Sequence, residues 1–188
     1  PVSPTGQSKT GIAFDVPSSG NLQELVGLLG GTSREASYQW QAAALELDAD
    51  PKIANLSPTE RNRLIAARLG QGKFREDLLR YWGNACALTG CEITEVLIAS
   101  HIKAWALGTD TERLDPNNGL LLVADADRLF DRGLISFSDT GQLLTKASLS
   151  PTQLAILGLS MDMRLRKVDR HHLFYLAAHR ALHGFQNA

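Results

Sequence analysis

The chain has 188 residues, of which 44% are hydrophobic and 21% charged, and its formal net charge is −1. These proportions are typical of a globular protein, and the near-neutral charge argues against attachment to nucleic acid through bulk positive potential. The longest apolar runs, such as 120–124, are far shorter than the roughly 20 residues that span a bilayer, which excludes a membrane-spanning protein.

The start of the chain predicts a flexible arm and no targeting signal. Residues 1–20 are rich in Ser, Gly, Pro and Thr and show no apolar period. Without a signal peptide, and with only two cysteines, the chain differs from small secreted domains, so we expect a cytoplasmic protein. Because it begins at Pro1 and not at a methionine, we also expect a longer parent protein whose missing part holds a specificity domain.

Apolar spacing predicts four helices before residue 83. The first two cover about 21–29 and 33–50, where apolar residues recur on one helical face. Ser57-Pro58-Thr59-Glu60 is a capping box that starts a third helix, and Gly70 is expected to end it. The fourth helix covers 73–82, where aromatic and aliphatic residues again recur on one side.

Beyond Gly83 the helical period gives way to short apolar runs between turn residues, which are typical of strands. The expected strands cover 96–100, 119–123, 134–137 and 143–146, and the expected helices cover 126–132 with Asp125 as N-cap, a segment after Ser150, and 168–183. The sequence thus predicts a mixed α+β protein. We expect it to be divided into an arm at 1–20, a helical region at 21–70 and a second domain at 71–188.

Three patterns that suggest ligand sites are incomplete. Gly70-Gln-Gly-Lys73 lacks the first glycine and the hydroxyl residue of a phosphate-binding loop. Cys86 and Cys91 supply half of a zinc site, and the sequence has no other cysteine. His179 and His183 share a helical face but lack the glutamate of a metalloprotease helix. We therefore expect a tight turn at the thiols and packing roles for partly exposed histidines.

Four polar residues in the second domain form an ordered set. His101 leaves one expected strand, Asn118 opens the next, and Asp127 and Asp131 lie four apart on the following helix. Two carboxylates on one helical face can bind Mg²⁺, and a neutral imidazole nearby can take a proton from an attacking water. The alternative is that His101 is a buried structural residue and that the two aspartates pair with neighbouring arginines.

Four motifs in this region resemble the signature of the HNH endonuclease family. They are Cys86-Ala-Leu-Thr-Gly90, Ala99-Ser-His-Ile-Lys-Ala-Trp105, Asn118-Gly-Leu-Leu-Leu122 and Leu129-Phe-Asp-Arg-Gly-Leu-Ile-Ser-Phe137. The resemblance extends from about residue 72 through the last helix. It implies a ββα-metal core with an added hairpin, in which His101 is the general base, Asn118 holds the loop in shape and Asp127 binds a metal ion from the helix.

Two positions depart from the family pattern. Where the family often has histidine, Asp127 offers an oxygen ligand that suits Mg²⁺ or Mn²⁺. Ser100 stands before the expected base, at a metal-ligand position that is frequently Asp or His, so the site lacks one anionic ligand. We expect Asp131 to compensate for this loss as a further ligand.

Six basic residues are candidates for contacts with DNA phosphates. Lys103, Arg128 and Arg132 flank the expected site, where they would position DNA without reading its sequence. Arg164, Arg166 and Lys167 belong to the most basic segment, 151–188, which contains five basic and two acidic residues. The alternative for each of them is an ordinary solvent-exposed charge.

Together these features predict a metal-dependent DNA endonuclease in restriction or in another defence or phage-related role. One site cuts one strand, so double-strand cleavage calls for a homodimer or for two successive nicks. Two alternatives stay open: a degenerate HNH-fold module that binds DNA without cutting it, and a protein-interaction domain that has kept only the fold.

Overall fold

The computed structural model describes residues 40, 42–47 and 57–185. Contacts between residues divide the chain into two units, Pro1–Lys73 and Phe74–Ala188. The expected arm at 1–20 and helix at 21–29 lie outside the described residues, as does most of the helix expected at 33–50.

In the first unit, residues 42–47 are helical and pack Ala43 and Leu47 against Ile65. Arg68 and Glu46 form an exposed ion pair across the same contact. None of the helices in the described ranges combines the length and the apolar character that a membrane crossing requires.

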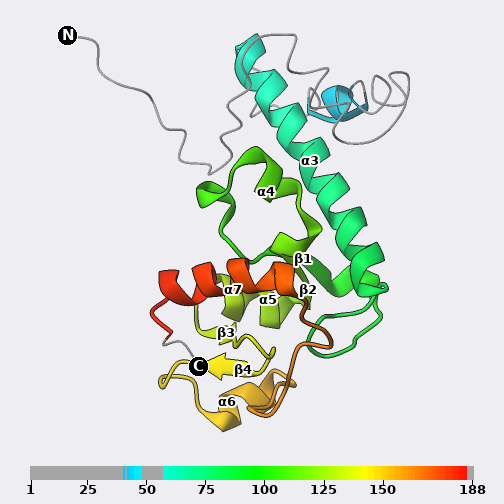
Figure 1. Ribbon diagram of the computed structural model, residues 1–188. Helices are drawn as coiled ribbons and strands as arrows, with labels where there is room; N and C mark the ends of the chain where they lie inside the picture. The colour runs from blue at the N-terminus through cyan, green and yellow to red at the C-terminus, as the bar shows by residue number, and fades with distance from the viewer. Residues whose placement is uncertain (1–39, 41, 48–56, 186–188) are drawn as a thin grey trace, which may run out of the picture. The chain divides into compact units, whose positions relative to one another are not determined.

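Helix α3 spans Pro58–Trp82 without interruption, although the sequence predicts a break at Gly70 (Figure 1). Its start is as expected, because the Ser57 N–H donates to the Glu60 carboxylate at 2.9 Å and the Glu60 N–H donates to the Ser57 hydroxyl. A glycine inside a helix costs only about 1 kcal/mol relative to alanine. Apolar side chains are buried on both sides of Gly70, so burial outweighs this cost and the expected break was wrong.

The core of the second unit is a pair of antiparallel strands covered by a helix. Strand β1 (Leu97–His101) pairs with β2 (Gly119–Val123), with His101 opposite Gly119. Helix α5 (Ala124–Asp131) follows β2 directly and packs on both strands, as Figure 1 shows. The strand β2 was predicted with these bounds, whereas β1 starts one residue later than expected, after a short 3₁₀ turn η2 (Thr94–Val96).

The direct join between β2 and α5 corrects one expectation. Val123 occupies the N-cap position without a side-chain hydrogen bond, and Asp125 lies in the first turn of α5 and does not cap it. An acidic residue in the first turn still interacts favourably with the helix dipole. The expected cap was therefore misplaced by two residues because the sequence shows no linker.

Strand β2 is buried on both faces, and Gly119 is where a helix approaches it most closely. A Cβ atom added to Gly119 would lie 2.6 Å from Phe74 Cζ and 2.7 Å from Leu78 Cδ2, both of which are side chains of α3. The indole N–H of Trp82 also donates to the Gly119 carbonyl at 3.2 Å. The last two turns of α3 thus need a glycine opposite them.

We expect Gly119→Ala to lower the free energy of unfolding by about 1–3 kcal/mol, because the added methyl group overpacks a filled core. Gly72→Ala in α3 is the matched control, since a Cβ there meets no atom of the described residues within 4 Å. That control should be neutral or stabilise the protein by up to about 1 kcal/mol. Urea unfolding of both variants measures the difference, and equal midpoints would contradict this account.

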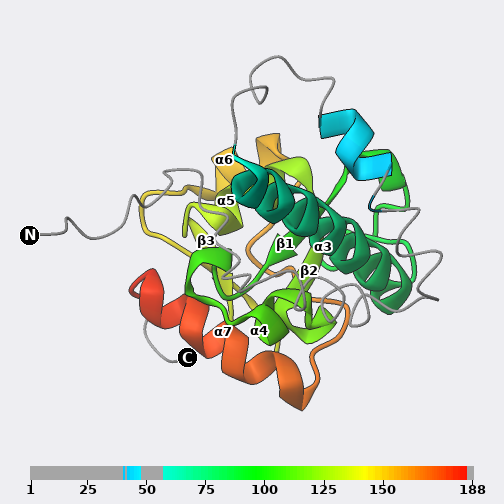
Figure 2. The same cartoon turned by 90° about the horizontal axis from the view of Figure 1, so that it is seen from above.

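The remaining elements confirm the mixed α+β class, and they include a helix, α4, between β1 and β2 that the sequence did not predict. They are η3 (Trp105–Leu107), α4 (Asp110–Leu114), η4 (Pro116–Asn118), the hairpin β3 (Ile135–Phe137) and β4 (Leu143–Thr145), α6 (Pro151–Ile156) and α7 (Arg170–Leu182). Ser150 and Gln153 form the capping box of α6, and Asp169 caps α7. In Figure 2, α7 is drawn in orange to red, and it packs against η4 and β3.

Candidate active site

His101 lies at the end of β1 and is held on three sides. Its ring stacks on Phe74, with 3.8 Å between centroids and 8° between planes, and it meets the edge of Trp105 at 4.9 Å. Its Nε2 atom lies 2.9 Å from the carbonyl oxygen of Arg113. Because a carbonyl can only accept, Nε2 carries the hydrogen in the neutral ring and Nδ1 keeps a lone pair.

Burial also keeps this imidazole neutral. Loss of solvent lowers the pKa of His101 below its ordinary value of 6.5, and the hydrogen bond to the Arg113 carbonyl opposes this shift only in part. A histidine that is neutral near pH 7, with a defined basic nitrogen, has the chemistry of a general base.

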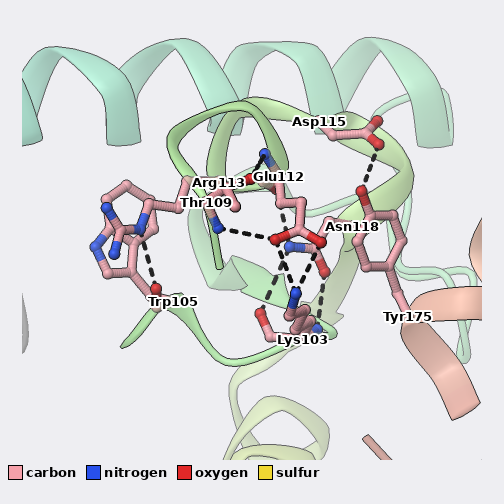
Figure 3. Close-up of polar contacts among 8 residues, drawn as sticks. All are labelled: Lys103, Trp105, Thr109, Glu112, Arg113, Asp115, Asn118 and Tyr175. Carbon is pink, nitrogen blue, oxygen red and sulfur yellow. Dashed lines mark hydrogen bonds and ion pairs between the residues drawn. The ribbon is translucent and has the colours of Figure 1, made fainter. Parts of the chain in front are cut away.

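Asn118 ties together the loop that follows His101. The side chain is fully buried, its Oδ1 accepts the backbone N–H of Lys103 at 2.8 Å, and its Nδ2 donates to the carbonyl of Glu112 at 2.9 Å (Figure 3). Both ends of the segment from Lys103 to Glu112 are thus bound to one residue, which immediately precedes β2. These contacts support the loop-holding role expected for Asn118.

Asp127 and Ser100 meet between α5 and β1. The buried Ser100 hydroxyl hydrogen-bonds to the Asp127 carboxylate. Burial raises the pKa of Asp127, as does the negative charge of Asp131, while the bond from Ser100 and the charge of Arg128 lower it. Since Ser100 precedes His101 in β1, this hydrogen bond connects the acidic helix with the strand that carries the imidazole.

Asp131 is much more exposed than Asp127. Its side chain is 67% exposed and lies 3.8 Å from the guanidinium of Arg128, an exposed i,i+3 pair. Such pairs stabilise a helix by only about 0.3–0.5 kcal/mol. Asp131 therefore keeps a carboxylate at the rim of the site that is free to turn toward a cation.

The donor set fits a hard cation that keeps much of its water. In the part of the chain that the structure describes, no three His, Cys, Asp or Glu side chains converge as a preformed metal site. Mg²⁺ commonly needs only one or two carboxylates, with waters and substrate phosphates completing its shell. Burial and Asp131 both disfavour the charged form of Asp127, and a bound cation would favour it. Asp127 with Asp131 nearby fits such an ion, whereas Ser100 contacts the carboxylate.

The six basic candidates fall into different environments. Lys103 is paired with Glu112, and Arg128 and Arg132 are exposed on and just after α5. Arg164 donates to the side chain of Gln142 at 2.7 Å. Arg166 and Lys167 donate to the backbone carbonyls of Trp82 and Tyr81, at the end of α3.

Arg164, Arg166 and Lys167, which we call the tail cations, therefore have hydrogen-bond partners within the protein that the sequence did not suggest. Lys167 also lies 3.5 Å from the centroid of the Tyr81 ring, and burial lowers its pKa. The contacts of Arg166 and Lys167 bind the segment between α6 and α7 to the end of α3. Arg166 and Lys167 are exposed to solvent and also bonded to the backbone of α3.

The other sequence patterns have structural roles as well. Cys86 is buried, and its N–H donates to the Cys91 carbonyl at 2.8 Å, in a tight turn as expected. His179 is buried, in contrast to the expected partial exposure, with hydrogen bonds to Ser136 and to the Phe130 carbonyl. Its burial lowers its pKa to about 4, so it is neutral in the core.

The loop between β1 and β2 contains the residues that sequence reasoning missed. Glu112 and Arg113 lie in α4, and Asp115 accepts a hydrogen bond from Tyr175 of α7 at 2.8 Å (Figure 3). The signal that could have revealed α4 is Thr109-x-x-Glu112, a capping box that the structure forms in both directions. No helix was among the elements expected between the two strands, because this stretch is polar.

Comparison with known families supplies one match. Residues 86–138 match a family described as HNH endonuclease. No curated protein matches the chain. The matched segment runs from the turn at Cys86 to the end of β3 and includes Ser100, His101, Asn118 and Asp127.

Proposed function

Because residues 86–138 belong to the HNH endonuclease family, we propose that this nuclease domain hydrolyses phosphodiester bonds of DNA with the help of a divalent metal ion. The observation that carries the proposal is the hydrogen bond from His101 Nε2 to the Arg113 carbonyl, which leaves Nδ1 as the basic atom. We place the activity in restriction or in another defence or phage-related setting.

In the proposed reaction His101 acts as the general base. Its Nδ1 accepts a proton from the attacking water, while Nε2 stays bonded to the Arg113 carbonyl and stabilises the imidazolium that forms. Phe74 and Trp105 keep the ring in one plane, so the base does not need to be ordered during the reaction.

Asp127 would hold the metal ion, with Asp131 as a second or orienting ligand. Mg²⁺ or Mn²⁺ bound there would offset the charge that develops on the phosphate and on the leaving oxygen. The Ser100 hydroxyl orients the Asp127 carboxylate. Asn118 keeps the loop that carries the Arg113 carbonyl close to β1.

The test of the function is nicking of supercoiled plasmid by the purified protein with Mg²⁺, with Mn²⁺ and with a chelator. Metal-dependent conversion to the open-circular form is expected. Linear product at early times would indicate that two sites act together, as in a homodimer. Binding without any cleavage would favour the second candidate, a degenerate DNA-binding module. The serine at position 100, which replaces an anionic ligand, is the observation that favours it.

We expect the acid limb of the pH profile to lie below pH 6.5. The base is active when neutral, and because burial lowers the pKa of His101, the neutral form persists to lower pH than in a free histidine. Plasmid nicking should thus be nearly constant from about pH 8 to pH 7 and should fall only in more acidic buffer. An apparent pKa above 7 in kcat/KM would contradict this assignment.

For contacts with DNA phosphates we favour Arg128 and Arg132, since both side chains are exposed. Arg128 forms only a long ion pair, with 3.8 Å between its guanidinium and the Asp131 carboxylate. Arg128→Gln with Arg132→Gln should weaken binding to all DNA sequences alike and flatten the slope of log affinity against log salt by up to about 0.9 per lost contact. Arg164→Gln with Lys167→Gln is the comparison pair. If the comparison pair alone changed the salt slope, the DNA would lie over the tail.

A further inference from the structure

We propose that the ion pair between Lys103 and Glu112 is a positioning device for His101: it holds α4 so that the Arg113 carbonyl stays against Nε2. This inference rests on the proposed function, because it gives the pair a part in orienting the base. It also replaces the phosphate contact that the sequence suggests for Lys103.

The ion pair is close and shielded from solvent. The Lys103 ammonium lies 2.7 Å from one Glu112 carboxylate oxygen and 2.8 Å from the other, and both side chains are only about one-fifth exposed (Figure 3). The ring of Phe174 lies 5.7 Å from the same ammonium. For comparison, the charged atoms of Arg128 and Asp131 are 3.8 Å apart, and both side chains are about two-thirds exposed. Lys103 would have to give up two short hydrogen bonds to reach a phosphate.

A small displacement of Glu112 would also displace the neighbouring Arg113 carbonyl, which binds His101. The Glu112 carboxylate accepts the N–H of Thr109 at 2.8 Å, and the carbonyl of the same residue accepts from Asn118. The next residue, Arg113, supplies the carbonyl that binds His101 Nε2. The ion pair therefore holds the residue that directly precedes Arg113, whose carbonyl oxygen orients the imidazole.

Helix α4 cannot hold this geometry by itself. It contains five residues, Asp110–Leu114, and so short a helix is unstable in water without side-chain contacts. The contacts that fix it include the Lys103–Glu112 pair, the Asn118 amide and the Arg113 guanidinium. The guanidinium donates to the Trp105 carbonyl at 3.0 Å and to Asp110 at 2.7 Å. The ion pair joins the side chain of Glu112 directly to Lys103, two residues after the end of β1.

Loss of the pair should change the tautomer of the imidazole. When the Arg113 carbonyl moves away, the hydrogen is no longer held on Nε2, and part of the population carries it on Nδ1. That fraction cannot accept a proton from water at Nδ1. Catalysis then slows while the surface that meets DNA is unchanged, so kcat falls and KM does not.

The experiment compares Lys103→Met, Glu112→Gln, their combination and Lys103→Arg with the wild type. It measures single-turnover nicking with Mg²⁺, DNA affinity in chelator, and the ¹⁵N chemical shifts of the His101 imidazole at a pH where the ring is neutral. Arg80→Met is the matched control, because Arg80 is 72% exposed and pairs with Asp77 on α3. Thermal melting checks that each variant is folded.

We expect both single variants to nick DNA about 10- to 100-fold more slowly, the loss associated with small misplacements of reacting groups. DNA affinity should stay within about twofold, and the double variant should be no slower than either single one, since the two residues act as a unit. Lys103→Arg should keep most of the rate. The ¹⁵N shifts should show Nε2–H in the wild type and a mixture of tautomers in Lys103→Met and Glu112→Gln.

A phosphate-binding Lys103 gives the opposite pattern. Glu112→Gln would then release the lysine and tighten DNA binding, Lys103→Met would weaken it, and neither would change the tautomer; that result overturns the inference. If the wild type did not cut DNA at all, the proposed function would fail, and the ¹⁵N shifts alone would still decide whether the pair orients His101.

Discussion

Replacing His101 with alanine is expected to slow single-turnover DNA nicking by about 10²- to 10⁴-fold, the usual contribution of a general base. The variant removes the basic Nδ1 atom whose availability follows from the bond between Nε2 and the Arg113 carbonyl. It leaves Arg128 and Arg132, the proposed DNA contacts, unchanged, so affinity measured in chelator should stay close to that of the wild type. Plasmid nicking under enzyme excess measures the rate.

A structural effect of the same substitution has to be separated from the catalytic one. The imidazole packs between Phe74 and Trp105, so alanine leaves a cavity and some loss of stability is expected. His101→Gln fills more of that space and also lacks the imidazole base, which makes it the companion variant. Near wild-type nicking by a folded His101→Gln protein would rule out the assignment of the base.

Replacing Asp127 should abolish most of the activity by a different route, through loss of the metal ion. Calorimetric titration with Mn²⁺ should show a much weaker isotherm for Asp127→Ala, and the nicking rate should fall with it. Asp131→Asn should have a smaller effect, because that carboxylate is 67% exposed at the rim. Asp127→His should retain part of the activity with a changed metal preference. An unchanged isotherm for Asp127→Ala would remove Asp127 from the ligand set.

The stability of an Asp127 variant should rise while its activity is lost. Because burial raises the pKa of Asp127 above its ordinary value, the folded protein disfavours the ionised form, and this form destabilises the fold at pH 7. Asp127→Asn removes the charge and keeps an oxygen that can accept from Ser100. We therefore expect a melting temperature at pH 7 at least equal to that of the wild type. A clear loss of stability would indicate a structural role for the carboxylate.

Several local features of the chain could be predicted from the sequence. The capping boxes at Ser57 and Ser150, the strand 119–123, the hairpin and the order of strand, strand and helix all follow from patterns within a few residues. The same holds for the motifs around His101, Asn118 and Asp127, whose resemblance to the HNH endonuclease signature agrees with the family match over residues 86–138. Local patterns suffice here because caps, alternation and helical spacing are properties of neighbouring residues.

Continuity of α3 through Gly70 was decided by burial and not by propensity. Glycine weakens a helix by only about 1 kcal/mol, and apolar side chains of α3 are buried both before and after it. Whether such a residue ends a helix depends on what packs around it, and a single sequence does not show those partners.

The partners of the charged and basic groups, by contrast, become visible only in the folded chain. Arg166 and Lys167 bind carbonyls 84 and 86 residues away, and Lys103 binds a carboxylate nine residues along the chain. The residue types show that these side chains are charged, but they do not show which groups the charges bind. The basic nitrogen of His101 is likewise set by the backbone oxygen of Arg113, an atom that every residue type has. A contact to such an atom leaves no trace in the sequence and exists only once α4 is folded against β1.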